Sequence, residues 1–330
     1  MQSEELKFKV ITPIFSYGHK ARDNNAEPEI RSSSIKGMMR YMFRIIQPDF
    51  DHDPRESTRE LRALENELFG DAEVRSSPVK LALISKIEEK DFDEQPFLLH
   101  KKKRNEVKNK KIGINPGVIF KLRIMTRHKA PKSLDWYNNL IQLTFILIGL
   151  GQRSRKGRGR IVYLSEILPA KIPAKAMKKL IEGWLNQICL NKGGYKLEGD
   201  KITPQHYSKS KRPVIQKIEF GEITSDWDKF LAKVDEASHE VKKQEHDYAQ
   251  SLRGKDYYAT GSAGIKSKGT GRFSSSVIVG MAETTEGYLP IYTYLKPVVR
   301  SQLLNPEKSK EELKMFRNTI DRVSIGGNVK

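Results

Sequence analysis

Cysteine is almost absent from this chain of 330 residues, and Cys189 is its single example. One cysteine cannot form a disulfide within the chain, and no Cys/His cluster of the kind that holds zinc is present. Cys189 lies in an apolar, helix-like stretch, which favours a small core residue. We therefore expect no disulfide framework, no metal site and no cofactor.

Long hydrophobic runs are also missing. The most apolar stretch, near Leu143 to Leu150, is interrupted and is too short to cross a bilayer. The opening residues, MQSEELKFKV, lack the basic-then-apolar order of a signal peptide. We expect a soluble, cytoplasmic protein with no membrane partner.

Acidic residues are outnumbered. Sixty lysines and arginines face 41 aspartates and glutamates, and the formal net charge is +19. Such a surplus causes electrostatic self-repulsion unless a polyanion neutralises it, so it favours nucleic acid as a partner. The alternative is a lysine-rich surface without that partner, such as thermophile proteins have. Because acidic residues are still numerous, the places where basic residues outnumber them decide whether a nucleic-acid site is present.

Apolar periodicity predicts the order strand, helix, strand, strand, helix, strand before residue 168. The expected strands span 6–12, 79–87, 117–127 and 161–167, the helices span 35–46 and 134–148, and 57–69 is an inserted helix. This is the split βαβ order of a ferredoxin-like, RRM-like domain. Pro169 and Pro173 mark the end of that unit.

The second half predicts helices at 175–190, 226–253 and 306–320, and strands at 214–222, 275–282 and 288–295. Its strand order cannot be read from the pattern. We predict an α+β protein of two ferredoxin-like (βαββαβ) domains in tandem with helical and loop insertions. The N-terminal domain, 1–168, contains a glycine-rich loop, and the C-terminal domain is 169–330.

The segment GLGQRSRKGRGR, residues 149–160, carries the strongest functional signal. Glycine lets the backbone approach a ligand closely, successive amides can form an anion-binding nest, and arginine supplies forked donors for phosphate. A flexible turn with solvated charges is the alternative, which we consider weaker because no acid is present. The segment is neither a P-loop nor a dinucleotide fingerprint. The predicted RNA contacts are Gly151, Arg153, Arg155, Lys156, Arg158 and Arg160.

A second basic feature lies on the helix predicted at 35–46. Lys36, Arg40 and Arg44 are four residues apart and form one ridge, without an acid at i±4. Arg31, Ser33 and Ser34 precede them, and serines with free amides at a helix start can hold a phosphate. A solvated helix face is the alternative. In a ferredoxin-like fold this helix and the glycine-rich loop can approach one surface.

Two further basic segments, a predicted loop at 101–111 and the segment 253–272, carry weaker predictions, since charge runs are usually solvated or disordered. Aromatic residues near the second segment, Tyr257, Tyr258 and Phe273, could stack on bases. His19 is the best candidate for a general base in metal-independent RNA cleavage, although an ordinary loop residue is the simpler interpretation. The additional candidate RNA contacts are His19, Lys101, Lys102, Lys103, Arg104, Lys266 and Arg272.

The glycine spacing resembles a known signature. Gly149-Leu150-Gly151, five residues, then Gly157-Arg158-Gly159 is similar to the loop of the RAMP superfamily of CRISPR-associated RNA-binding proteins, with Arg158 where that loop normally has an apolar residue. The stretches VITP at 10–13 with Gly18, RSSSIKGMMRYMFR at 31–44 and LFG at 68–70 resemble the first RAMP subunit of the type III-B Cmr effector complex. These motifs cover the first 160 residues.

The resemblance implies two ferredoxin-like domains and a non-catalytic RNA-binding subunit of an antiviral ribonucleoprotein. It places such a subunit near the 3′ end of the guide RNA, with guide RNA, target RNA and other Cmr-complex RAMP subunits as partners. Target cleavage is assigned to a different subunit, so no catalytic residue is expected. Two alternatives remain open: a metal-independent RAMP endoribonuclease that processes CRISPR precursor RNA, and a scaffold that binds only neighbouring proteins.

Overall fold

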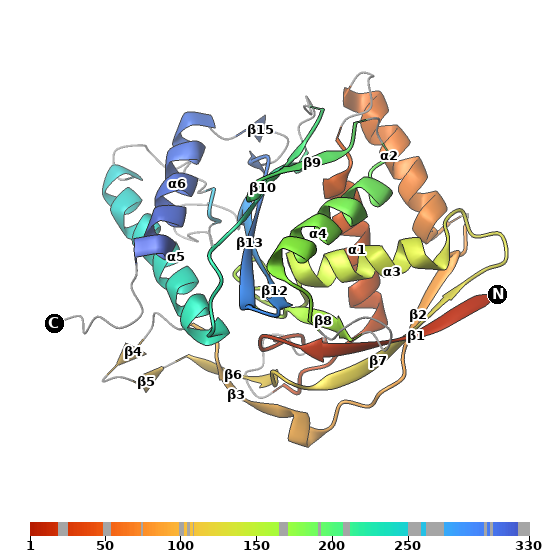
Figure 1. Cartoon of the computed structure of the whole chain (residues 1–330), viewed down its shortest axis with the longest axis horizontal. Helices are drawn as coiled ribbons and strands as arrows, with labels where there is room; N and C mark the ends of the chain where they lie inside the picture. The colour runs from red at the N-terminus through yellow and green to blue at the C-terminus, as the bar shows by residue number, and fades with distance from the viewer. Residues whose placement is uncertain are drawn as a thin grey trace.

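The structure is a computed structural model in which two β-sheets alternate with two helical layers (Figure 1). None of its described helices is both long and apolar enough to cross a membrane. The described residues are 1–18, 26–48, 54–73, 75–98, 102–103, 106–107, 109–164, 171–190, 193–206, 212–249, 259–261, 274–299, 302–303 and 306–322.

The first sheet is antiparallel, with strand order β2-β7-β1-β8. Its strands are β1 (Gln2–Val10), β2 (Val79–Leu83), β7 (Ile119–Thr126) and β8 (Ile161–Leu164). The first and third of these strands lie in the middle, which is the strand order of a ferredoxin-like unit. Helix α1 (Ser32–Ile46) follows β1, and α3 (Leu134–Leu143) with the π-helical turn η2 (Thr144–Ile148) follows β7. The predicted inserted helix is α2 (Pro54–Phe69).

The stretch predicted as a basic loop instead belongs to a ribbon of short strands. After the short helix η1 (Glu89–Asp91), β3 (Phe92–Pro96) pairs with β6 (Lys110–Ile114). Between them, β4 (Lys102–Lys103) pairs with β5 (Glu106–Val107). The loop interpretation of 101–111 was therefore wrong for the residues that the structure describes.

The second sheet has the order β12-β13-β11-β10-β9. The second half of the chain runs α4 (Ala174–Ile188), β9 (Tyr195–Glu198), β10 (Lys201–Pro204), β11 (Ile215–Phe220), α5 (Trp227–Ala249), β12 (Val277–Thr284), β13 (Gly287–Leu295), β14 (Val298–Val299), β15 (Gln302–Leu303) and α6 (Pro306–Arg322). Neither β9 nor β10 was predicted. Strand β10 occupies the place of the fourth ferredoxin strand, beside β11, but precedes the other three along the chain. The unit thus keeps ferredoxin-like neighbours in a permuted chain order, with β9 as an extra edge strand.

Both faces of the second sheet are covered. Val277 and Val279 of β12 pack with the apolar side chains of α5 and α6, whereas Ile278 points into the core shared with α1, α3 and α4. Alternating residues of a strand face opposite sides, so the sheet lies between two helical layers, as Figure 1 shows. The hydrophobic core continues across both halves of the chain. The predicted boundary at 168/169 lies outside the described residues.

Candidate nucleic-acid interface

The N-terminal turn of α1 is open to an anion. We predicted that Ser33 and Ser34 precede the helix. The helix begins at Ser32, so both serines lie within its first turn instead. The side chain of the N-cap residue, Arg31, forms no capping hydrogen bond, and no acid lies in the first turn. Arg31, exposed beside it, pairs with Glu29 at 3.3 Å. Unsatisfied amides and the helix dipole make such an end favourable for phosphate.

The basic ridge of α1 faces helix α2 instead of an open surface. The Nε of Arg40 donates to Glu65 Oε1 at 2.7 Å, and Nη1 of Arg44 donates to both Glu65 oxygens at 2.8 and 2.9 Å. Lys36 Nζ donates to Ser77 Oγ at 2.5 Å, and burial followed by repulsion from Arg40 lowers the pKa of Lys36. The ridge has no acid at i±4, as the sequence shows, but Glu65 reaches Arg40 and Arg44 from another helix.

The glycine-rich loop is packed against the chain that follows β1. Gly149, Gly151, Gly157 and Gly159 all have positive φ, between 67° and 88°. Gln152 N donates to Phe15 O at 2.7 Å, and Gly159 N donates to Pro13 O at 2.9 Å. A Cβ at Gly151 would lie 2.6 Å from the Phe15 carbonyl oxygen. Close contacts within the protein therefore account for these glycines, with backbone atoms at Gly149, Gly151 and Gly159 and with the Leu231 side chain at Gly157. They do not form the open nest that we predicted.

Three arginines of the loop are directed into the protein. Arg158, which is 1% exposed, donates to both oxygens of the fully buried Asp235 on α5, at 3.2 and 2.8 Å, and Arg153 donates to the same carboxylate. Arg160 is fully buried and donates to the carbonyls of Ser154 and Val279. Burial lowers the pKa of Arg160 to about 9, so it remains a cation at neutral pH. The prediction of unpaired, phosphate-facing charges was wrong for these three residues.

The other two cations of the loop connect it to its surroundings. Arg155 donates to Ser275 O and to the hydroxyl of Tyr41 on α1, each at 2.5 Å, and its guanidinium lies 5.2 Å from the centre of the Tyr41 ring. Lys156 Nζ donates to Thr260 O at 3.1 Å. The predicted approach of α1 and the glycine-rich loop to one surface is confirmed by the contact between Arg155 and Tyr41.

One feature of this surface was not predicted. Gly37 is exposed in the middle of α1, and a Cβ there would meet no described atom within 4 Å. Glycine inside a helix costs about 1 kcal/mol relative to alanine, and packing within the described chain does not explain it. It leaves bare helix backbone that a ligand can approach closely. We call Arg31, Ser33, Ser34, Gly37, Tyr41 and Arg155 the α1–loop surface.

Some predicted contacts fall outside the described residues: His19, Lys101, Arg104, Lys266 and Arg272, together with the aromatic residues Tyr257, Tyr258 and Phe273. Lys102 and Lys103 form β4. Among the described residues, no three His, Cys, Asp or Glu side chains come together as a metal site would require.

Comparisons with known proteins relate these features to a family. Residues 7–162 match the model of the RAMP superfamily. Over 97% of the chain the fold is similar to Cmr1 from Pyrococcus furiosus in its apo form, with a TM-score of 0.55, 18% identity and 96% of that protein covered. A chain in the type III-B Cmr-beta structure bound to cognate target RNA gives a TM-score of 0.54 and 12% identity, with 96% and 99% of the two chains covered.

No curated protein sequence matches the chain significantly. The family match covers the βαββαβ unit with its glycine-rich loop, and the structural match covers nearly everything else. Residues 7–162 are therefore similar to the RAMP superfamily, and over nearly its whole length the chain has a fold similar to that of Cmr1.

Proposed function

We propose that this protein is a non-catalytic RNA-binding subunit of a type III-B CRISPR effector complex, acting in the cytoplasm in antiviral defence. It would lie near the 3′ end of the guide RNA and contact guide RNA, target RNA or both, beside other RAMP subunits. The observation that carries the proposal is the α1–loop surface, where an uncapped helix N-terminus, a bare glycine and Arg155 lie together. The net charge of +19 and the Cmr1 fold support it.

The chemistry of this surface suits the backbone of RNA rather than its bases. Amides and serine hydroxyls of the first turn can donate to phosphate oxygens, and Arg31 supplies charge. Such contacts position a strand without reading its sequence. Guide–target pairing would supply the sequence information, as in other RNA-guided systems.

Gly37→Ala tests the close approach. We expect affinity for single-stranded RNA to fall about tenfold, equivalent to the loss of one charge-assisted hydrogen bond, because the added methyl holds the strand away from α1. Fluorescence anisotropy with labelled RNA measures this. The variant should also be more stable by about 1 kcal/mol, because alanine favours a helix.

Gly183→Ala is the matched control. Gly183 is likewise exposed inside a helix, α4, and no described atom lies within 4 Å of the site for its Cβ. It should be stabilised by a similar amount and retain wild-type RNA affinity. If both variants bind RNA equally well, the α1–loop surface is not where the strand lies.

Salt dependence separates this function from its rivals. Each phosphate that a cation neutralises releases counterions, so binding should weaken steeply as salt rises, with a slope of about −0.7 per phosphate for single strands. The RNA should remain intact during incubation, whereas metal-independent cleavage would indicate a processing endoribonuclease. A flat salt response with stable co-purification of neighbouring subunits would instead indicate a protein scaffold.

A further inference from the structure

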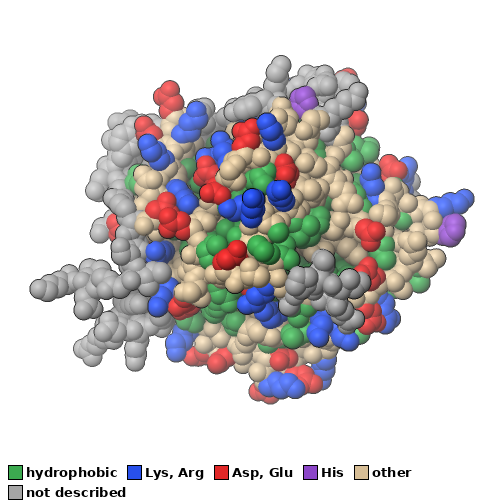
Figure 2. All heavy atoms as spheres, viewed as in Figure 1, with side chains coloured by type: hydrophobic (Ala, Val, Ile, Leu, Met, Phe, Trp, Pro, Cys, Tyr) green, Lys and Arg blue, Asp and Glu red, His purple; other side chains and the backbone are tan. Residues whose placement is uncertain are grey.

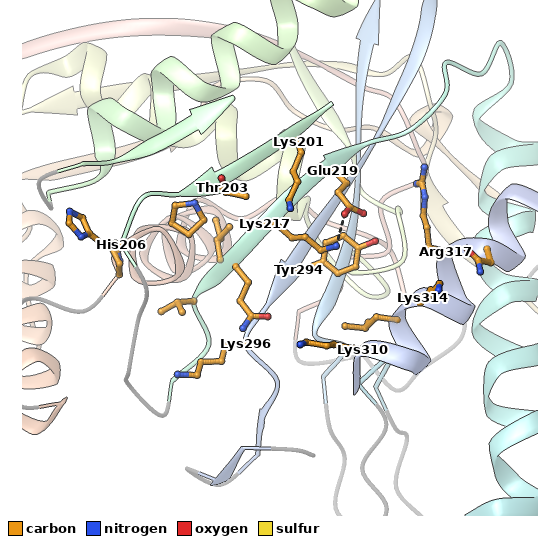
Figure 3. A pocket seen from close by; sticks show the side chains of 17 residues that line it. Lys201, Thr203, His206, Lys217, Glu219, Tyr294, Lys296, Lys310, Lys314 and Arg317 are labelled. Atoms are coloured by element: carbon orange, nitrogen blue, oxygen red, sulfur yellow. Dashed lines mark hydrogen bonds and ion pairs between the residues drawn. The ribbon is translucent and has the colours of Figure 1, made fainter. Parts of the chain in front are cut away.

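The second half of the chain contains a cationic pocket of about 610 Å³ between the second sheet and α6 (Figure 3). Figure 2 shows Lys and Arg side chains above hydrophobic side chains in the middle of this face, over β10 and β13. We call this pocket, between the second sheet and α6, the α6 pocket. Its cationic lining consists of Lys201, Lys217, Lys296, Lys310, Lys314 and Arg317.

The single acid of the lining, Glu219, is already engaged. Lys217 Nζ donates to Glu219 Oε1 at 2.5 Å and lies 4.3 Å from the centre of the Tyr294 ring. Burial is the largest single influence and acts to raise the pKa of Glu219, but the hydrogen bond and charge of Lys217, with smaller contributions from Tyr294 and Arg317, together lower it. This carboxylate is therefore ionised at neutral pH and is neutralised by Lys217, so it does not offset the other lysines.

The exposed rim of the pocket keeps its charge. Lys310 and Lys314 lie one turn apart on α6, both exposed, and neither forms an ion pair with a described residue. Lys201 is exposed on β10 across the pocket, as Figure 3 shows. Three ammonium groups around one hollow repel one another unless an anion enters.

The walls behind this rim are partly apolar. Pro204 and Leu313 are half-buried and Pro48 is buried. The volume falls within the usual range for pockets that hold small ligands. Apolar walls below a cationic rim suit a ligand with a flat apolar part and a negative part, as a nucleotide has. Lysines contact phosphate as mobile point charges, which suits a strand backbone.

We propose that the α6 pocket holds one or two nucleotides of single-stranded RNA. Lys310, Lys314 and Lys201 contact the phosphates, and a base lies against Pro204 and Leu313. This rests on the proposed function and extends it by a second contact. The pocket lies at the C-terminal end of α1, beyond Ile46, whereas the α1–loop surface lies at its N-terminal end. The 15 residues of α1 span about 22 Å, so this distance separates the N-terminal turn of α1 from the end of the helix beside the pocket.

Lys310→Gln with Lys314→Gln tests the pocket, and Lys175→Gln with Lys179→Gln is the matched control. Lys175 and Lys179 are exposed and four apart on α4, so both double variants lose the same charge from the same spacing. With a labelled single-stranded RNA of about 16 nucleotides, we expect the pocket variant to lose about tenfold in affinity and about 1.4 in salt slope. The control should stay within about twofold of wild type.

The outcomes distinguish the proposals. RNA binding by the wild type with equal affinities for the two double variants would overturn the pocket alone. No RNA binding by the wild type would overturn the proposed function and the pocket together. If adenosine monophosphate displaces the RNA at concentrations as low as those at which RNA itself binds, the pocket is a site for free nucleotides and the strand proposal is overturned. If the pocket variant keeps its RNA affinity but no longer binds a neighbouring subunit, the α6 pocket is a protein contact instead.

Discussion

Replacing Asp235 by asparagine should lower the free energy of unfolding by about 3–5 kcal/mol, the largest effect that we expect from a change of charge. Asp235 is fully buried and accepts hydrogen bonds from Arg153 and Arg158. The amide would leave two cations beside it without a counter-charge, and Arg158 is 1% exposed. Urea denaturation followed by circular dichroism measures the loss.

Asp200→Asn provides the comparison for a surface ion pair. Asp200 accepts from Lys178 at 2.5 Å, but its side chain is 73% exposed. We expect a loss below about 1 kcal/mol there, because water screens exposed pairs. Adding Arg158→Met to Asp235→Asn removes one of the two cations left without a counter-charge, so it should recover part of the lost free energy of unfolding. Similar losses from Asp235→Asn and Asp200→Asn would mean that the buried cluster does not hold the loop in place.

Gly159→Ala should destabilise the protein by about 4 kcal/mol, because alanine would meet both an unfavourable φ and a steric clash. Gly159 has a φ of +67°, and a Cβ there would lie 2.8 Å from the Leu150 carbonyl carbon and closer still to its oxygen. These are backbone atoms, so no side-chain rotation relieves the contact. Thermal and urea unfolding of the variant measure the effect.

Gly199→Ala separates these two costs. Gly199, in the turn between β9 and β10, has a φ of +58°, but a Cβ there meets no described atom within 4 Å. It should lose only the cost of the left-handed conformation, about 1–2 kcal/mol. A Gly159→Ala variant as stable as Gly199→Ala, yet defective in RNA binding, would restore the phosphate nest that we first predicted for this loop.

Elements with strong apolar periodicity were predicted close to their observed bounds. Helix α6, expected at 306–320, spans Pro306–Arg322, and β13, expected at 288–295, spans Gly287–Leu295. Strands β9 and β10 were missed because each has only four residues, with one buried side chain apiece, Tyr195 and Ile202. So short an alternation in a polar stretch gives little indication of a strand. Because the permuted strand order of the second sheet depends on β10, that order could not be predicted either.

The charges of the site were harder to predict, because their partners are distant in sequence. Glu65 lies more than 20 residues from Arg40 and Arg44, and Asp235 lies 77 residues from Arg158. A signal for Asp235 did exist. It is one turn from Leu231 and adjacent to Val234 on α5, both buried, so an acid there needs a buried cation. Nothing local indicates which cation that is.

The pairing of Arg158 with Asp235 also explains a departure from the family pattern. The RAMP loop that this segment resembles normally has an apolar residue between its last two glycines, whereas here Arg158 stands there. Its charge is buried and satisfied by α5, so the loop ties the two halves of the chain together. Under the proposed function, the surface that remains for RNA is the N-terminal turn of α1 with the partly exposed Arg155.

Ultraviolet crosslinking of RNA to the assembled complex, followed by mass spectrometry of the RNA-linked peptides, tests this placement most directly. RNA should be attached to the peptides that carry Arg31 to Tyr41 and Gln152 to Lys156 of this chain. If RNA-linked peptides come from neighbouring subunits and from other parts of this chain, but never from these two segments, the strand does not lie on the α1–loop surface.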